Sequence, residues 1–219
     1  MTAITAWEEA YQRFETPAEE QRKFIRRLRR LGVARWNREW RILEICSGRG
    51  SGLLAWRQLG FPHAVGVDLS VALVQRSECR GRSLVGDARC LPVRTSSQNV
   101  AIVQGGLHHV GSLDDVRAAL REMRRVLTPD GRAIIIEPWR TPFLRGVHLV
   151  AERKIMRALS RKLDAFAAMA EEERPTYEAW LARPDAILTA ITADFEALVI
   201  RRRLGKLVFV GRPRPVTAG

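Results

Sequence analysis

The sequence predicts an α/β fold built on a mostly parallel sheet with helices on both faces. Between residues 41 and 138, short apolar runs of strand length alternate with segments that carry helical signals. The first run, residues 41–46, leads into a glycine-rich turn, residues 47–52, and then into a helix. Right-handed crossovers between parallel strands place ligands at the carboxyl ends of the strands, so we expect the functional site there.

The segment before the first strand, residues 1–40, is expected to be helical. Thr16 and Glu19 form a capping-box pattern with a proline between them, and apolar residues follow at helical spacing. Gly32 is a typical stop signal. The pattern therefore predicts a helix over residues 17–31.

The core elements follow in a regular order. A second apolar strand, residues 65–68, ends in Asp68, and a strand over residues 100–104 runs into a Gly-Gly-Leu-His-His sequence. Ser112 caps a helix whose apolar residues repeat every three or four positions, which predicts a stripe that packs on the sheet. Another strand follows at residues 133–137.

The pattern changes after this strand. Residues 144–170 are mostly helical by periodicity, and residues 171–175 interrupt them. A helix over residues 184–194 then precedes two apolar strands, residues 196–202 and 204–211. The short connection between these strands predicts an antiparallel hairpin.

Composition limits the classes of function. The 219 residues suit one α/β domain with a modest insertion. The net charge of +13 attracts phosphate backbones, yet 33 of the 37 basic residues are arginine, and the sequence has no RNA-binding signature. A nucleic-acid partner is therefore an alternative that the sequence does not favour. The three cysteines are an odd number without metal-ligand spacing, so we expect free thiols and no metal site.

Targeting signals are also informative. The first residues contain acids and lack the basic-then-apolar pattern of a signal peptide, and no apolar run is long enough to span a bilayer. We expect a cytoplasmic protein without a membrane partner. The sequence leaves the oligomeric state undetermined.

Taken in order, the glycine-rich turn, the strand that ends in Asp68 and the later motifs resemble the class I S-adenosylmethionine-dependent methyltransferases. They are most similar to the small-molecule group that includes the ubiquinone and menaquinone methyltransferases. A dinucleotide fingerprint would instead need a glycine where the chain has Leu53. The resemblance implies a Rossmann-like fold with a seven-stranded sheet, completed by the C-terminal antiparallel hairpin.

The resemblance also implies an organisation of the chain. Residues 1–219 would form one methyltransferase domain, with an N-terminal helical segment over residues 1–40. Residues 41–138 would form the cofactor-binding core, and residues 141–182 a helical cover over the substrate pocket, inserted before the hairpin. The cofactor would be S-adenosylmethionine, which leaves as S-adenosylhomocysteine.

Eleven cofactor-binding residues follow from the resemblance. They are Glu44, Cys46, Ser47, Gly48, Gly50, Asp68, Leu69, Asp87, Ala88, Gln104 and Gly105. Asp68 would accept the ribose hydroxyls because a carboxylate has two acceptor oxygens and no donor. Leu69 would cover the adenine, and Asp87 would meet its amino edge. Glu44 would organise the turn near the methionine end of the cofactor, and Gln104 would approach its amino acid portion.

Two positions depart from the family pattern. The family usually has a glycine where this chain has Cys46, whose side chain is small enough to preserve the turn provided that its φ is negative. Asn99 stands where the family usually has an aspartate, and it keeps a turn-forming side chain. Neither change removes a group that methyl transfer requires.

His108 and His109 are the candidate catalytic residues, because histidine titrates near neutral pH and the pair follows the strand whose end would face the methyl group. The pair could instead cap a helix or pack, and Glu137 is a weaker alternative. His63 and His148 have no evident partner and are expected at the surface.

The predicted activity is methyl transfer from S-adenosylmethionine to a small-molecule acceptor by in-line displacement. The alternatives are an RNA methyltransferase and a catalytically silent cofactor-binding protein. A helix would align Arg153, Arg157 and Arg161 in a stripe, which would lie on the substrate cover in a small-molecule enzyme or contact phosphates in an RNA methyltransferase. Separately, Trp7 and Tyr11 either pack in the fold or close over the cofactor. The sequence does not identify the acceptor.

Overall fold

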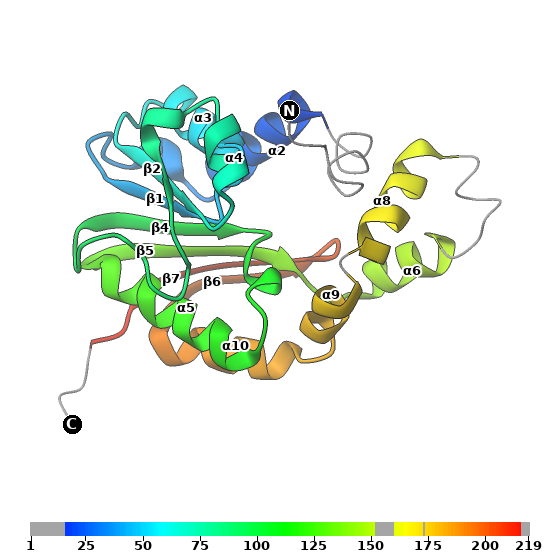
Figure 1. Ribbon diagram of the computed structural model, residues 1–219. Coiled ribbons are helices and arrows are strands. Elements are labelled where there is room, and N and C mark those ends of the chain that lie inside the picture. The colour runs from blue at the N-terminus through cyan, green and yellow to red at the C-terminus, as the bar shows by residue number, and fades with distance from the viewer. Residues whose placement is uncertain (1–15, 152–159, 173, 216–219) are drawn as a thin grey trace.

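The computed structural model describes residues 16–151, 160–172 and 174–215. Seven strands within these residues form one sheet in the order β3-β2-β1-β4-β5-β7-β6 (Figure 1). They are β1 (Ile42–Ile45), β2 (Ala64–Asp68), β3 (Ser83–Val85), β4 (Gln98–Gln104), β5 (Leu127–Pro138), β6 (Phe195–Arg203) and β7 (Lys206–Pro213). Strands β1 to β5 pair in parallel, and β7 is antiparallel to both of its neighbours. The predicted fold class is confirmed.

The central strands are buried on both faces. In β4, Val100 and Ile102 join one hydrophobic core, while Ala101 and Val103 join the core on the opposite face. The same alternation continues along β5. Because both faces are covered, these strands appear in the sequence as continuous apolar runs rather than as alternating polar and apolar residues.

Helices cover the two faces of the sheet as Figure 1 shows. Helices α2 (Pro17–Arg30) and α3 (Ser51–Gln58) pack on one face, and α5 (Leu113–Val126) and α10 (Pro184–Asp194) pack on the other. A shorter helix, α4 (Val71–Arg76), follows β2. The predicted capping box of α2 is present, because Glu19 N donates to Thr16 Oγ1 at 3.3 Å and Thr16 N donates to Glu19 Oε2 at 3.0 Å.

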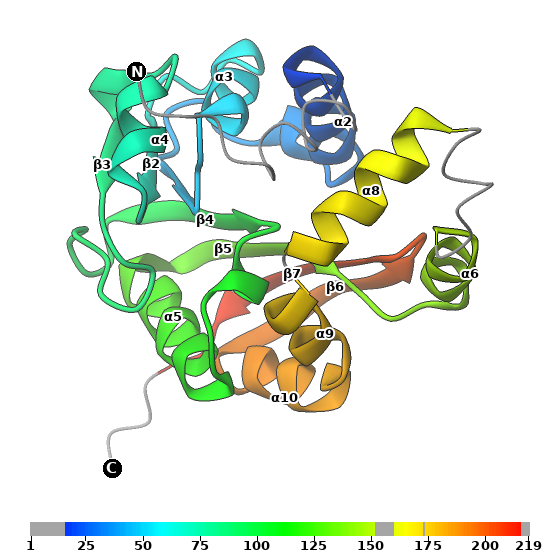
Figure 2. The same ribbon diagram turned by 45° about the vertical axis from the view of Figure 1, so that its right-hand side comes forward.

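Three further helices stand beyond the carboxyl ends of β4 and β5 (Figure 2). They are α6 (Pro142–Ala151), α8 (Arg161–Glu172) and α9 (Arg174–Leu181). The described part of residues 144–170 is mostly helical, as predicted, because α6 covers residues 144–151 and α8 covers residues 161–170, while Ser160 before α8 is not helical. The apolar periodicity continues across this point, so the sequence gives no sign of the interruption.

The remaining elements are the 3₁₀ turns η1 (Val33–Arg35), η2 (Arg80–Arg82) and η3 (Leu107–His109). Within the described residues, no helix is both long and apolar enough to cross a membrane. Trp7, Tyr11, Arg153 and Arg157 lie outside the described residues, and only the backbone of Arg161 is described.

Candidate functional site

The order of the strands places a crevice between β1 and β4. The chain runs outward from β1 through β2 to β3, and then returns to β4 on the other side of β1. The loops that follow β1 and β4 therefore diverge at their carboxyl ends, which is where ligands of such sheets bind. The sequence-predicted cofactor residues lie at the carboxyl ends of β1, β2 and β4 and in the segments that follow β1 to β4.

The glycine-rich loop after β1 is held by Asp68, at the end of β2. Gly48 N donates to Asp68 Oδ2 at 2.7 Å, and Ser70 N donates to Asp68 Oδ1 at 2.9 Å. Gly48 and Gly50 have φ values of 53° and 82°, in the left-handed region that glycine enters without strain. Each carboxylate oxygen of Asp68 still has acceptor capacity, since an ionised carboxylate offers about four lone-pair sites.

Two of the glycines at this edge face open space. A Cβ added to Gly48 or to Gly105 would meet no atom of the described residues within 4 Å. Gly105, whose φ is 66°, follows β4 and donates its N–H to Ile136 O at 2.8 Å. The backbone is therefore exposed on both sides of the crevice, as a close-lying ligand requires.

Glu44 is a buried acid under this loop. Its exposed fraction is 6%, and a Cβ on Gly52 would lie only 1.9 Å from Glu44 Oε1, so α3 packs directly on the carboxyl group. Burial, with a smaller effect of the Glu20 charge, raises the pKa of Glu44 to about 8. The carboxyl group is thus mostly protonated at neutral pH. Its Oε2 atom has no hydrogen-bond partner among the described residues.

Cys46 differs from its expected conformation. A negative φ was expected for Cys46, but its φ is 56°, so the residue occupies the left-handed region. The family's usual glycine would enter this region freely, whereas an L-residue with a side chain meets steric strain there. Burial, and then the charge of Glu137, raises the pKa of the Cys46 thiol to about 12, so the group is a thiol and not a thiolate at neutral pH.

The residues expected around adenine lie next to Asp68. Gly86 N donates to Asp68 O at 2.9 Å, which brings the following residues, Asp87 and Ala88, to the end of β2. Leu69, immediately after Asp68, is 69% exposed. Asp87 is paired with Arg89 through Oδ1 and Oδ2, and these hydrogen bonds lower the pKa of its carboxyl group.

Gln104, at the end of β4, is tied to helix α2. Its Oε1 atom accepts a hydrogen bond from Arg27 Nη1. The sequence did not identify Arg27 as a residue of this site. The two residues are far apart in the sequence, so no local sequence pattern predicts their contact.

The paired histidines occupy different environments. His108 is 6% exposed, and its Nδ1 atom lies 2.8 Å from Oε2 of Glu137, which is 1% exposed. The other oxygen of Glu137 accepts hydrogen bonds from Gly106 N and Leu107 N, both at 2.9 Å. His109 is exposed, and its ring centroid lies 3.9 Å from that of His108. Glu137 therefore orients the His108 ring and the start of η3 together.

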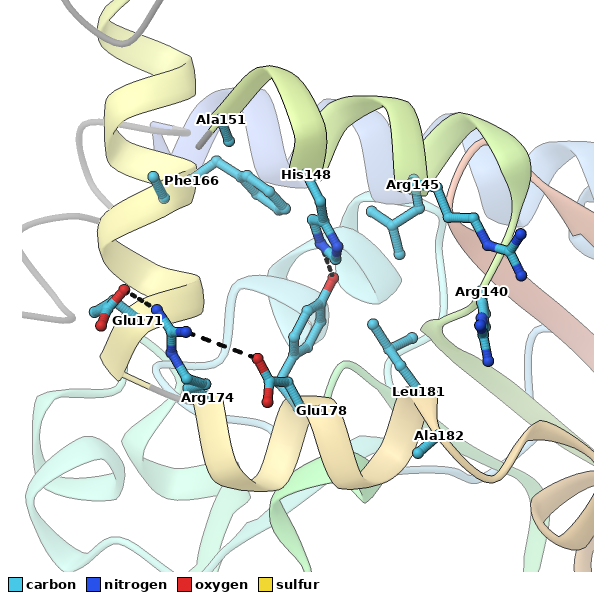
Figure 3. A pocket seen from close by; sticks show the side chains of 13 residues that line it. Arg140, Arg145, His148, Ala151, Phe166, Glu171, Arg174, Glu178, Leu181 and Ala182 are labelled. Carbon is cyan, nitrogen blue, oxygen red and sulfur yellow. Dashed lines mark hydrogen bonds and ion pairs between the residues drawn. The ribbon is translucent and has the colours of Figure 1, made fainter. Parts of the chain in front are cut away.

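A pocket of about 820 Å³ lies between α6, α8 and α9 (Figure 3). It is lined by Arg140, Leu144, Arg145, His148, Ala151, Phe166, Ala167, Glu171, Arg174, Tyr177, Glu178, Leu181 and Ala182. The Tyr177 ring packs edge-on to His108 with centroids 6.2 Å apart, and Trp180 Nε1 donates to Pro138 O at 2.8 Å. Helix α9 is thereby fixed to the ends of β5 and η3.

His148 is not an unpartnered surface residue, so that expectation is wrong. Its Nε2 atom lies 3.2 Å from the Tyr177 hydroxyl, and its ring stacks on Phe166 with centroids 5.6 Å apart. The expectation failed because Tyr177 lies 29 positions away on another helix. The spacing of Tyr177 and Trp180, one helical turn apart, was the available signal for an aromatic face. His63 meets Glu39 at 3.0 Å and is half exposed.

Comparisons with known proteins agree with this geometry. Residues 43–135 match a family described as a methyltransferase domain. A demethylmenaquinone methyltransferase of Streptomyces avermitilis is 26% identical over 182 residues, which cover 78% of this chain and 75% of the relative.

Solved structures share the fold. A protein from Pyrococcus horikoshii has a TM-score of 0.70 at 16% identity and covers 97% of this chain and 100% of its own. An S-adenosylmethionine-dependent methyltransferase from Mesorhizobium loti has a TM-score of 0.55 at 18% identity, covering 84% and 96% of the two chains. The matched domain, the named relative and the sheet topology together support a class I S-adenosylmethionine-dependent methyltransferase.

Proposed function

We propose that this methyltransferase moves a methyl group to a small-molecule acceptor by in-line displacement. The observation that carries the proposal is the pocket between α6, α8 and α9, which reaches His108 through Tyr177. Its volume of about 820 Å³ is within the range of roughly 300–1,000 Å³ that small-molecule sites span. The named relative is a demethylmenaquinone methyltransferase, which also favours a small organic acceptor.

The residues at the carboxyl ends of β1 and β2 fit S-adenosylmethionine. Asp68 keeps acceptor capacity for a ribose diol beside the Gly48 backbone, and the exposed Leu69 offers an apolar surface for adenine. Glu44 Oε2 and Ser47 Oγ are buried without a hydrogen-bond partner among the described residues. Because buried polar atoms are normally satisfied, a ligand with ammonium and hydroxyl donors suits this place.

The other predicted residues complete this binding site in the proposal. Cys46 and Gly50 shape the loop, Asp87 and Ala88 border the adenine, and Gln104 with Gly105 borders the amino acid portion. When bound, the cofactor supplies a methyl group activated by its sulfonium. The protein then needs mainly to align the acceptor and exclude water, and alignment alone can account for roughly 7–11 kcal/mol of a barrier.

A proton acceptor is present for hydroxyl substrates. We assign this role to His108, because Glu137 holds its Nδ1 and thereby leaves Nε2 as the basic nitrogen of the neutral ring. His109, which is exposed and whose ring lies tilted against that of His108, is the second candidate. Glu137 acts as the positioning residue, since both of its oxygens are already bound to η3.

Two experiments test the proposed function. Calorimetric titration with S-adenosylhomocysteine should show binding at one site per chain, and radiolabelled methyl transfer should occur to a member of a metabolite panel. Absence of S-adenosylhomocysteine binding would refute the cofactor assignment. Label that appears only in RNA, with strongly salt-dependent RNA affinity, would replace the small-molecule acceptor with the nucleic-acid alternative. Cofactor binding without transfer to either class would favour the silent binding protein.

A further inference from the structure

We infer that the acceptor has a planar apolar body and carries an oxyanion, which Arg140 and Arg145 bind. This inference rests on the proposed function, because it takes the pocket between α6, α8 and α9 as the acceptor site. It specifies the chemical class of the acceptor and makes Arg140 and Arg145 the residues that select an anionic acceptor.

The pocket has two chemically different sides. On one side, Arg174 pairs with Glu171 and lies 4.0 Å from Glu178 Oε1, so its charge is offset by two carboxylates. Arg140 and Arg145 line the opposite side of the pocket in Figure 3. Among the described lining residues, the acidic side chains therefore lie with Arg174, and only arginines carry charge on the opposite side.

Among the residues that the structure describes, Arg140 and Arg145 have no charge partner. Neither guanidinium has a hydrogen bond or an ion pair to any side chain or backbone group among the described residues. Other arginines of the chain do form such pairs, including Arg125 with Glu122. An oxyanion that accepts hydrogen bonds from these guanidinium groups would offset their positive charge.

The segment that carries Arg140 is anchored on both sides. Trp139, immediately before it, is 4% exposed and donates its N–H to Gly205 O at 2.8 Å. Thr141, immediately after it, accepts hydrogen bonds at Oγ1 from Leu144 N at 3.2 Å and from Gly205 N at 3.0 Å. The backbone at Arg140 and the first turn of α6, which carries Arg145, are therefore fixed to the β6–β7 turn. Because this backbone is already held in place, less conformational entropy is lost when an anion binds.

The middle of the pocket suits a flat ring. His148 and Phe166 stack at an interplanar angle of 23°, and Tyr177 meets His148 at 65°. Leu144, Leu181 and the alanines supply the remaining apolar surface. Aromatic rings prefer offset-stacked and edge-on neighbours, both of which this arrangement offers to an incoming ring.

The test compares two probes with the same ring system, 2-naphthoate and the neutral 2-naphthamide, titrated into protein saturated with S-adenosylhomocysteine. A third probe, 2-naphthyl phosphate, distinguishes a phosphate from a carboxylate as the preferred anion. We expect at least one anionic probe to bind about tenfold more tightly than the amide, as one or two charge-assisted hydrogen bonds at an exposed rim would produce. In the double variant Arg140→Gln with Arg145→Gln, this preference should disappear while the affinity for the amide is retained.

The matched control is Arg57→Gln with Arg94→Gln, which removes the same charge from two exposed arginines that do not line the pocket. It should keep the preference, which excludes an effect of net charge alone. Equal affinities of all probes in the parent protein, or a preference that survives in the pocket variant, would overturn the inference. Failure of every probe to bind at millimolar concentration would also overturn it. Saturation with S-adenosylhomocysteine is measured first, so a failed cofactor assignment is seen separately.

Discussion

The side chain of Cys46 fills the space in front of the α-carbon of Gly106. A Cβ at position 106 would lie 2.4 Å from Cys46 Cβ and 2.7 Å from Cys46 Sγ, closer than any real contact. Cys46 follows β1, and Gly106 follows β4, so the contact closes the bottom of the crevice between these strands. The side chain that replaces the family's usual glycine is therefore accommodated by a glycine on the facing loop.

This contact predicts a strong coupling between the two positions. Gly106→Ala should destabilise the protein by about 1–3 kcal/mol, as overpacking of a filled space does. In the background of Cys46→Gly, the same change should cost at least about 1 kcal/mol less, because the obstructing side chain is gone. Urea denaturation of the four proteins measures this difference. An equal cost of Gly106→Ala in both backgrounds would show that the two side chains do not compete for this space.

The buried acid predicts a specific dependence of stability on pH. Because the pKa of Glu44 rises from 4.5 to about 8 on folding, the folded state holds this proton more tightly than the unfolded state between these values. The stability contributed by the group is therefore greatest below pH 4.5 and falls as pH rises toward 8. The slope from this one group approaches about 1.4 kcal/mol per pH unit inside the window.

The matched variant is Glu44→Gln, which keeps the shape and removes the titration. We expect the free energy of unfolding of the cofactor-free parent, minus that of Glu44→Gln, to decrease between pH 5 and pH 8 and to level off above it. Denaturant melts at several pH values measure this difference. Parallel curves for the two proteins across this range would mean that Glu44 titrates normally in the folded protein.

Local patterns were sufficient to predict the sheet and the loops at its edge. Asp68 could be placed beside the glycine-rich loop because β1 and β2 are neighbouring parallel strands whose ends are set by their apolar runs. The relation of Cys46 to Gly106 could not be predicted in this way. The Cys46 side chain lies against Gly106, in a loop sixty residues later in the chain, and a pattern around residue 46 contains no information about that loop.

The acceptor side of the site was the least predictable part. The ring contacts of His148 with Phe166 and Tyr177 join helices α6, α8 and α9, whose relative placement is set by tertiary packing. Helical periodicity identifies the apolar face of each helix but not the partner that it meets. The same limit applies to Arg27, whose contact with Gln104 depends on how α2 lies across the sheet.

Asp68→Ala should weaken binding of S-adenosylhomocysteine by about tenfold or more. Hydrogen bonds to a charged group are worth about 1.5–3 kcal/mol each, and the change also removes the acceptor that fixes Gly48 N. Calorimetry measures the Kd, and Asp114→Ala, an exposed acid on α5, is the control that should bind as the parent does. Unchanged affinity in Asp68→Ala would place the ribose elsewhere.

The proton-transfer assignment predicts a difference between the two histidines. If the acceptor is a hydroxyl, His108→Asn should reduce turnover by roughly 10²–10⁴ while the affinity for S-adenosylhomocysteine changes little. His109→Asn should have a smaller effect, since its ring is exposed and lies tilted against the His108 ring. Single-turnover methyl transfer, with the acceptor identified in the panel, measures both variants.

The role of Glu137 can be tested in the same assay. Glu137→Gln still accepts from the Gly106 and Leu107 amides, but its amide nitrogen would donate toward His108 Nδ1 and reverse the tautomer. We expect a loss of turnover near that of His108→Asn, and no further loss when the two changes are combined, because both remove the same basic nitrogen. Multiplicative losses in the double variant would show that Glu137 acts independently of His108, and the positioning role would then be wrong.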